Sequence, residues 1–120
     1  MNDCDILVLE DEALIAMDIE MTLEEAGHDN IVVCHTADEA MLLIDRCKPK
    51  MALLDFNLGQ GANSELVARR LKADNVPFVF LSGYTESRVA ILDELATTKR
   101  IAKPFQNHEL LSKVSCILQA

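Results

Sequence analysis

Basic residues are scarce in this sequence of 120 residues. Eleven lysines and arginines stand against 20 aspartates and glutamates, which gives a formal net charge of −9. A chain with this excess of negative charge repels nucleic-acid backbones and anionic membranes, so we expect no direct binding to either. Part of the charge is local, because Glu10, Asp11 and Glu12 are consecutive and such a cluster attracts a cation.

Long apolar runs and paired cysteine motifs are also missing. No apolar stretch approaches the roughly 18 residues of a membrane span. The N-terminus also lacks the basic start and following apolar run that would indicate a signal peptide. The cysteines form no CxxC pair, and no histidine lies at a zinc-ligand spacing. We interpret the four cysteines as reduced thiols of a cytoplasmic protein and the three histidines as surface or turn residues. They are Cys4, Cys34, Cys47 and Cys116, and His28, His35 and His108.

Short apolar runs alternate with segments of helical period along the chain. Strands are predicted over residues 6–9, 31–34, 51–54, 77–81 and 100–102, and helices over 13–26, 36–47, 64–73, 86–96 and from 107 onwards. The strands are continuous apolar runs, as expected when helices cover both faces of a sheet. Right-handed crossovers then give an α/β fold of flavodoxin-like (βα)5 type, a doubly wound five-stranded parallel sheet with strand order 2-1-3-4-5.

Local signals support the helix boundaries. Thr36 and Glu39 have the spacing of a capping box, Gly27 is a good helix stop, and Asn107 suits the cap of the last helix. That helix has its apolar residues on one face, namely Leu110, Leu111, Val114, Ile117 and Leu118.

Polar residues follow four of the five predicted strands. Glu10 and Asp11 follow the first strand, Asp55 the third, Ser82 the fourth and Lys103 the fifth. Ligands of open α/β sheets bind beyond the carboxyl ends of the strands, so we expect these side chains to converge there. Taken singly, the acidic pair could favour a helix dipole, and the others could belong to turns or solvated loops. Their joint placement at strand ends favours a functional site.

The chemistry that these side chains suit is phosphoryl transfer to a carboxylate. Clustered carboxylates repel each other, and a hard cation such as Mg²⁺ relieves the repulsion. An ammonium group and a hydroxyl can then stabilise the remaining phosphoryl oxygens. Asp55 is the best candidate for the nucleophile because it lies centrally between the acidic pair and Lys103.

Four segments resemble the signature segments of response-regulator receiver domains. The resemblance covers essentially the whole chain, so residues 1–120 are expected to form one receiver domain. The segments are Leu9-Glu-Asp-Glu12, Leu53-Leu-Asp-Phe-Asn-Leu58, Phe80-Leu-Ser-Gly-Tyr84 and Lys103-Pro-Phe105.

This resemblance implies a role for each site residue. Asp55 would accept the phosphoryl group, while Ser82 and Lys103 would contact its oxygens. Four residues would hold Mg²⁺, with Asp11 as the more direct ligand of the acidic pair and Asn57 acting through its backbone carbonyl: Glu10, Asp11, Asp55 and Asn57.

The family also implies partners in two-component signalling. The phosphodonor would be a histidine kinase or a histidine phosphotransfer domain. The output would pass through a face built by helix four, strand five and helix five to a downstream protein that the sequence does not identify. The chain would be a signalling domain with only Mg²⁺-dependent self-phosphorylation and autodephosphorylation, and not an enzyme.

Two positions depart from the common receiver pattern. Ile101 stands where many receivers have an aromatic residue that swings inward, and Gly59 where many have a proline. The segment Pro77–Tyr84 instead resembles a subset of receivers with a Phe-Ala-Thr-Gly-Tyr-like fourth strand. We therefore expect phosphorylation to reorder the loop after Gly83 and helix four rather than to flip one aromatic ring.

Three other classes of protein remain as alternatives. An aspartyl-phosphate phosphatase would place an Asp-Xaa-Asp arrangement after the first strand, where this chain has Glu10-Asp11-Glu12. A flavodoxin-like nucleotide carrier would need a loop rich in glycine and hydroxyl residues there. A degenerate receiver that serves only as a docking module would lack some of the chemical groups, whereas all of them are present here.

Overall fold

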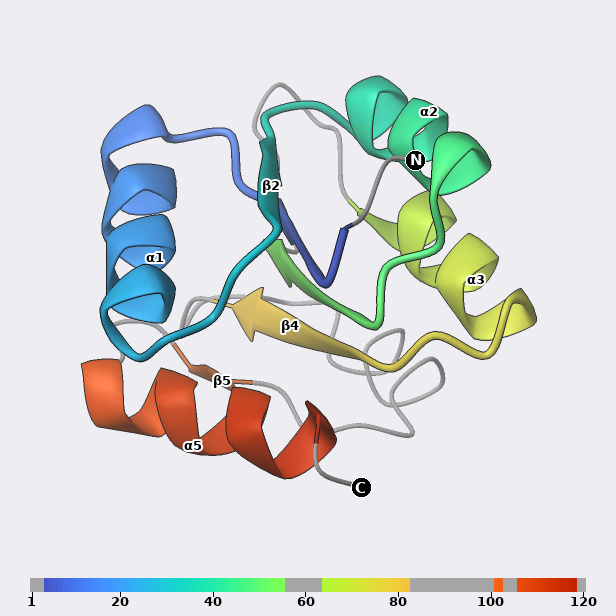
Figure 1. Cartoon of the computed structure of the whole chain (residues 1–120). Helices are drawn as coiled ribbons and strands as arrows, with labels where there is room; N and C mark the ends of the chain where they lie inside the picture. Colours follow the sequence, from blue (N-terminus) through green and yellow to red (C-terminus); the bar gives the residue numbers. More distant parts are fainter. Residues whose placement is uncertain (1–3, 56–63, 83–100, 103–105, 119–120) are drawn as a thin grey trace.

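A parallel β-sheet forms the middle layer of the molecule (Figure 1). The computed structural model describes residues 4–55, 64–82, 101–102 and 106–118. Four strands lie in the order β2-β1-β3-β4, and a two-residue strand pairs with β4 at the edge. The strands are β1 (Ile6–Leu9), β2 (Ile31–Cys34), β3 (Met51–Asp55), β4 (Phe78–Ser82) and β5 (Ile101–Ala102).

The order of the four longer strands confirms the predicted α/β fold with a parallel sheet. The complete (βα)5 alternation stays a prediction, because the helix expected over residues 86–96 lies outside the described residues. Within the described part, strand β4 begins at Phe78, one residue later than predicted, and includes Ser82.

Helices cover both faces of the sheet. Figure 1 shows α1 (Ala13–Glu25) and α5 (Asn107–Leu118) on one side, and α2 (Ala37–Arg46) and α3 (Glu65–Ala73) on the other. Alternate residues of each strand therefore enter two separate cores.

The two cores account for the continuous apolar runs of the strands. Leu7 and Leu9 of β1 pack with the buried residues of α2 and α3. Ile6 and Val8 pack with those of α1 and α5. All four of these β1 residues have no exposed surface, and complete burial of one such side chain contributes about 1.5–3 kcal/mol.

Gly27 ends α1 as the sequence predicted. Its φ of 95° lies in the left-handed region, where a residue with a Cβ is strained. This turn lets the N–H of His28 return to the carbonyl of Leu23 at 3.1 Å, which satisfies one of the last carbonyls of the helix.

The last helix begins at Asn107, where the sequence predicted it, but Asn107 lies inside the helix and not at its cap. Because Asn107 is the first residue of α5, the cap position falls to Gln106, one residue before the predicted cap. Gln106 holds the position before the helix because its carbonyl accepts the N–H of Leu110 at 3.3 Å. Its own N–H donates to Glu109 Oε1 at 3.3 Å. The predicted apolar face is confirmed, since Leu110 and Val114 are buried in the core.

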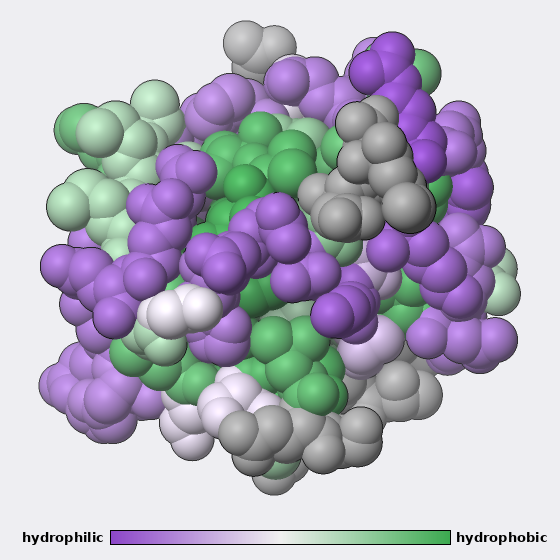
Figure 2. Space-filling model, viewed as in Figure 1, coloured by the Kyte–Doolittle hydropathy of each residue, from purple (hydrophilic) through white to green (hydrophobic). Residues whose placement is uncertain are grey.

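Helix α1 also has an apolar stripe on its outer face. Leu14, Met17 and Met21 are 81%, 55% and 54% exposed, and their spacing places them on one side of the helix. Figure 2 shows a corresponding green patch over α1. Among the helices described here, none is both long and apolar enough to span a bilayer.

Candidate functional site

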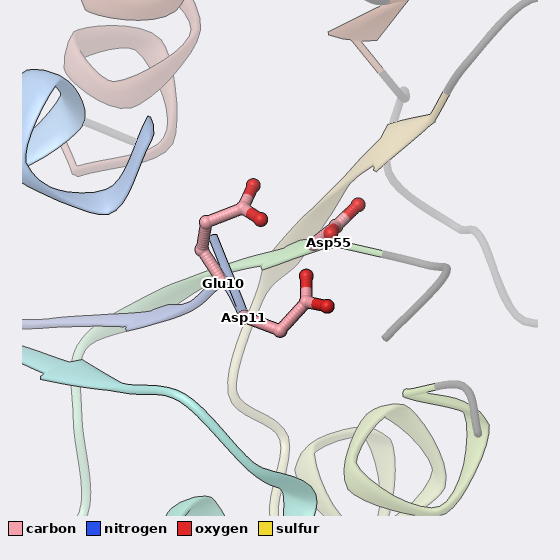
Figure 3. A group of neighbouring side chains, drawn as sticks. All are labelled: Glu10, Asp11 and Asp55. Carbon is pink, nitrogen blue, oxygen red and sulfur yellow. The ribbon is translucent and has the colours of Figure 1, made fainter. Parts of the chain in front are cut away.

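Strand pairing brings the predicted acidic residues together. In the register of β1 and β3, Leu9 pairs with Leu54, so the next residues, Glu10 and Asp55, follow neighbouring strand positions. The carboxylates of Glu10, Asp11 and Asp55 each offer an oxygen, and these oxygens all lie within 4.8 Å of one another. Figure 3 shows the three carboxylates gathered at the carboxyl ends of β1 and β3. We call these three residues the acidic cluster.

The burial of the acidic cluster fits a hard cation. Glu10 has no exposed surface and Asp55 is 5% exposed, whereas Asp11 is exposed. Buried carboxylates in close proximity are costly unless charge or hydrogen bonds compensate for them. Mg²⁺ prefers carboxylate oxygens and keeps several of its waters, so a cluster with two buried ligands and one exposed ligand suits it.

Local hydrogen bonds set the direction of Glu10. Its Oε2 accepts the N–H of Glu12 at 3.1 Å, just before α1 begins. The Glu10 side chain therefore satisfies one of the backbone N–H groups at the start of the helix. The simpler interpretation of the acidic pair, a helix N-terminal charge, thus holds in part for Glu10. Asp11 remains the more direct candidate for a metal ligand.

Ser82 lies at the same edge of the sheet. Asp55 pairs with Leu81 in the register of β3 and β4, so Ser82 is the residue that follows on the neighbouring strand. The structure describes its backbone but not its side chain. The hydroxyl role of Ser82 therefore stays a prediction.

Several predicted residues lie outside the described part of the chain. They include Asn57, Gly59, Gly83, Tyr84 and Lys103. Lys103 follows directly after Ala102, the last residue of β5, in the sequence. The side chain of Ile101 is not described either. The roles assigned to these residues stay predictions.

All four cysteines are free and none belongs to the acidic cluster. Burial, with the neighbouring Cys47 as a second cause, raises the pKa of the Cys4 thiol to about 12. Burial and the nearby Glu39 carboxylate raise the pKa of Cys34 to about 11. Both groups are therefore neutral thiols near pH 7 and poor nucleophiles.

His35 also lies at the site, although the sequence predicted only a surface or turn residue at this position. His35 is exposed at the surface as predicted, but its Nδ1 lies 3.0 Å from the carbonyl oxygen of Glu10. The signal that could have found it is its position directly after a predicted strand, as for Glu10 and Asp55.

Comparison with known families defines the class of protein. The sequence model described as "Response regulator receiver domain" matches residues 6–115. The chain belongs to this family, whose members are signal-transduction domains of two-component systems.

Curated relatives extend beyond the region that the chain matches. The phyllosphere-induced regulator PhyR of Methylorubrum extorquens is 36% identical over 113 residues, which cover 92% of this chain and 42% of PhyR. The phosphate regulon transcriptional regulatory protein PhoB of Pseudomonas aeruginosa is 33% identical over 120 residues, which cover 95% of this chain and 51% of PhoB. The chain thus spans about half the length of these relatives, or less.

Solved receiver structures have the same fold. The receiver domain of NtrX from Brucella abortus superposes with a TM-score of 0.85 at 25% identity, over 97% of this chain and 99% of that one. A response regulator receiver protein from Sinorhizobium medicae gives a TM-score of 0.81 at 26% identity, over 98% and 95% of the two chains.

Proposed function

We propose that this chain is a phosphorylation-dependent receiver of a two-component phosphorelay and that Asp55 accepts the phosphoryl group. The observation that carries the proposal is the acidic cluster, which joins Asp55 to Glu10 and Asp11 at the carboxyl ends of two central strands. Packing alone does not account for three carboxylates within 4.8 Å, two of them buried. In a member of the receiver family, they are best explained by phosphoryl chemistry.

The reaction is a displacement at phosphorus. A carboxylate oxygen of Asp55 attacks the phosphorus of a phosphohistidine, and a P–O bond forms as the P–N bond breaks. The electron pair of the broken bond stays on the departing ring nitrogen. The donor leaves as neutral imidazole when its other ring nitrogen carries a proton. The product on Asp55 is an acyl phosphate.

Glu10, Asp11 and Asp55, with the backbone carbonyl of Asn57, would hold Mg²⁺. When bound, the cation neutralises the carboxylates and the phosphoryl oxygens that approach them. Glu10 and Asp55 keep their carboxylates fixed because the surrounding sheet and helices bury them. Asp11 is exposed and can adjust to the ligand geometry.

Ser82 and Lys103 would contact the other phosphoryl oxygens. Ser82 comes directly after Leu81, which pairs with Asp55 across β3 and β4. Lys103 comes directly after the last residue of β5 in the sequence. Phosphorylation adds about −1.5 to −2 charge at Asp55, which attracts the hydroxyl and the ammonium group. The change would pass through helix four, β5 and α5 to a downstream protein.

A histidine kinase or a histidine phosphotransfer domain is the proposed donor. The exposed apolar stripe of α1 starts at Leu14, three residues after Asp11 in the sequence, so a phosphohistidine that reaches the acidic cluster passes close to it. An exposed apolar stripe beside a reactive site suits a protein donor.

A docking module without phosphoryl chemistry is the second candidate. It would account for the receiver fold but not for the buried carboxylates, which such a module does not need. An aspartyl-phosphate phosphatase is less suitable, because Asp55 is the last residue of β3, whereas that class places its acceptor after the first strand.

Intact mass spectrometry tests the proposal. The purified chain is incubated with acetyl phosphate and Mg²⁺, with EDTA in a parallel sample. The wild type should gain the mass of one phosphoryl group only when Mg²⁺ is present, and Asp55→Asn should gain none. An unchanged wild-type mass would favour the docking module.

A further inference from the structure

We propose that His35 is a positioning residue for the acidic cluster: it holds the peptide that links Glu10 to Asp11 and so directs the Asp11 carboxylate toward the cation. The inference rests on the proposed function in so far as the cluster binds Mg²⁺. It concerns a residue outside the cluster itself.

The end of β2 binds Glu10 through both of its backbone groups. The N–H of Glu10 donates to the carbonyl of Cys34 at 3.0 Å. The carbonyl of Glu10 lies 3.0 Å from Nδ1 of His35, the next residue along. A carbonyl oxygen can only accept a hydrogen bond, so Nδ1 carries the proton and donates it.

The hydrogen bond from His35 acts on a particular peptide group. The carbonyl of Glu10 and the N–H of Asp11 belong to the same planar unit. When the carbonyl is held, the plane is fixed, and with it the direction in which Asp11 leaves the strand. The side chain of Asp11 is exposed and therefore has little packing of its own to orient it.

His35 is itself held by the start of α2. Its backbone N–H donates to Glu39 Oε1 at 3.3 Å, and the same oxygen accepts the hydroxyl of Thr36 at 3.3 Å. The N–H of Glu39 donates to Thr36 Oγ1 at 3.1 Å, so the predicted capping box is present at this end of the helix. One arm of that box reaches His35 instead of the backbone N–H of Thr36. The helix cap therefore fixes the backbone from which the imidazole extends.

The alternative is a surface histidine whose contact with Glu10 has no effect on the cluster. The two cases differ in what a substitution at His35 does to cation binding. Residues that orient metal ligands typically change metal affinity by about 10- to 100-fold when they are removed. Substitution of a surface histidine without a positioning role should leave the metal affinity unchanged within the error of the measurement.

The test compares three substitutions of His35 in the full chain. His35→Ala removes the donor. His35→Asn places its amide nitrogen near the position of Nδ1, because both side chains branch at Cγ, whereas His35→Gln places its amide nitrogen farther out. His108→Ala is the matched control, because His108 is also an exposed histidine but lies on α5.

Two measurements are made on each variant without any phosphodonor. Isothermal titration with MgCl₂ gives the dissociation constant for Mg²⁺. An ¹H–¹⁵N NMR spectrum in EDTA gives the amide shift of Asp11, which reports on the hydrogen bond at the adjoining carbonyl of Glu10. Spectra of the remaining amides show whether each variant is folded.

We expect His35→Ala and His35→Gln to bind Mg²⁺ about tenfold more weakly and to shift the Asp11 amide. His35→Asn should restore both values to near those of the wild type, and His108→Ala should change neither. Equal Mg²⁺ affinity in the wild type and His35→Ala would overturn the inference, as would an equal loss in His35→Ala and His35→Asn. If the wild type binds no Mg²⁺ at all, the proposed function fails, while the Asp11 amide still reports whether His35 holds the peptide.

Discussion

Glu10 and Asp55 extend two neighbouring strands, and their carboxylate oxygens lie within 4.8 Å of each other although both side chains are nearly or completely buried. The pairing of Leu9 with Leu54 produces this arrangement, because each carboxylate residue comes directly after one member of the pair. The sheet therefore concentrates negative charge at one edge, and repulsion among these carboxylates opposes folding to the extent that it is not compensated.

Removing one charge from the acidic cluster should separate its effect on stability from its effect on metal binding. In EDTA, Asp11→Asn should raise the free energy of unfolding by up to about 1 kcal/mol, because one repelling carboxylate is lost at an exposed position. In Mg²⁺ at ten times the wild-type dissociation constant, the wild type should gain about 1.4 kcal/mol and the variant less. Urea denaturation with and without Mg²⁺ measures both effects.

Asp18→Asn is the matched control for this experiment, because Asp18 is another exposed aspartate and lies on α1. It should leave the gain in Mg²⁺ unchanged. A gain for Asp11→Asn equal to that of the wild type would argue against Asp11 as a ligand.

Much of the fold could be predicted from the sequence because the elements carry strong local signals. The apolar run from Ile6 to Leu9 and the run ending at Asp55 are short and continuous, as strands buried on both faces should be. Gly27 predicted the end of α1, and Thr36 predicted the start of α2. The convergence of Glu10, Asp11 and Asp55 followed from the rule that parallel strands place their carboxyl ends at one edge.

The contact of His35 with Glu10 could not be predicted in the same way. The contact depends on the register of β1 and β2, on the position of the start of α2 and on the rotamer of the His35 side chain. None of these produces a periodic pattern in the sequence. The position of His35 directly after a predicted strand indicates that it lies near the site, but not that it contacts Glu10, 25 positions away in the chain.

Substitutions at the residues before α2 and α3 should have different effects on the free energy of unfolding. Thr36 Oγ1 accepts the N–H of Glu39 at 3.1 Å, so Thr36→Ala should lower the free energy of unfolding by about 1 kcal/mol. Ser64 precedes α3, but its hydroxyl makes no cap bond and, within the described residues, is buried without a hydrogen-bond partner. Ser64→Ala removes an unsatisfied buried group and should leave stability unchanged or raise it.

Urea denaturation midpoints at constant m-value check the two cap predictions. A loss of about 1 kcal/mol or more in Ser64→Ala would mean that the hydroxyl has a partner whose hydrogen bond stabilises the fold.

The buried thiols should make the protein less stable at alkaline pH. The pKa of Cys34 rises from 9.0 to about 11 on folding, so below pH 9 the thiol is neutral in both states and its contribution is fully present. Between about pH 9 and 11 the unfolded thiol ionises while the folded one does not, and stability falls by up to about 1.4 kcal/mol per pH unit.

Cys34→Ala isolates this contribution from those of other titrating groups. The wild type should lose more stability than the variant between pH 8 and pH 10 in urea denaturation. If the stability of the two proteins fell equally with pH, the prediction would be wrong. The Cys34 thiol would then ionise as readily in the folded chain as in the unfolded one.

Locating the phosphoryl group on the chain tests most directly whether Asp55 is the acceptor. The wild-type chain is incubated with acetyl phosphate and Mg²⁺ and then reduced with borohydride, which converts an aspartyl phosphate to homoserine, before peptide mapping by mass spectrometry. We expect homoserine at position 55 in the wild type and none in Asp55→Asn. Homoserine at another aspartate of the wild type, or none anywhere, would contradict this expectation.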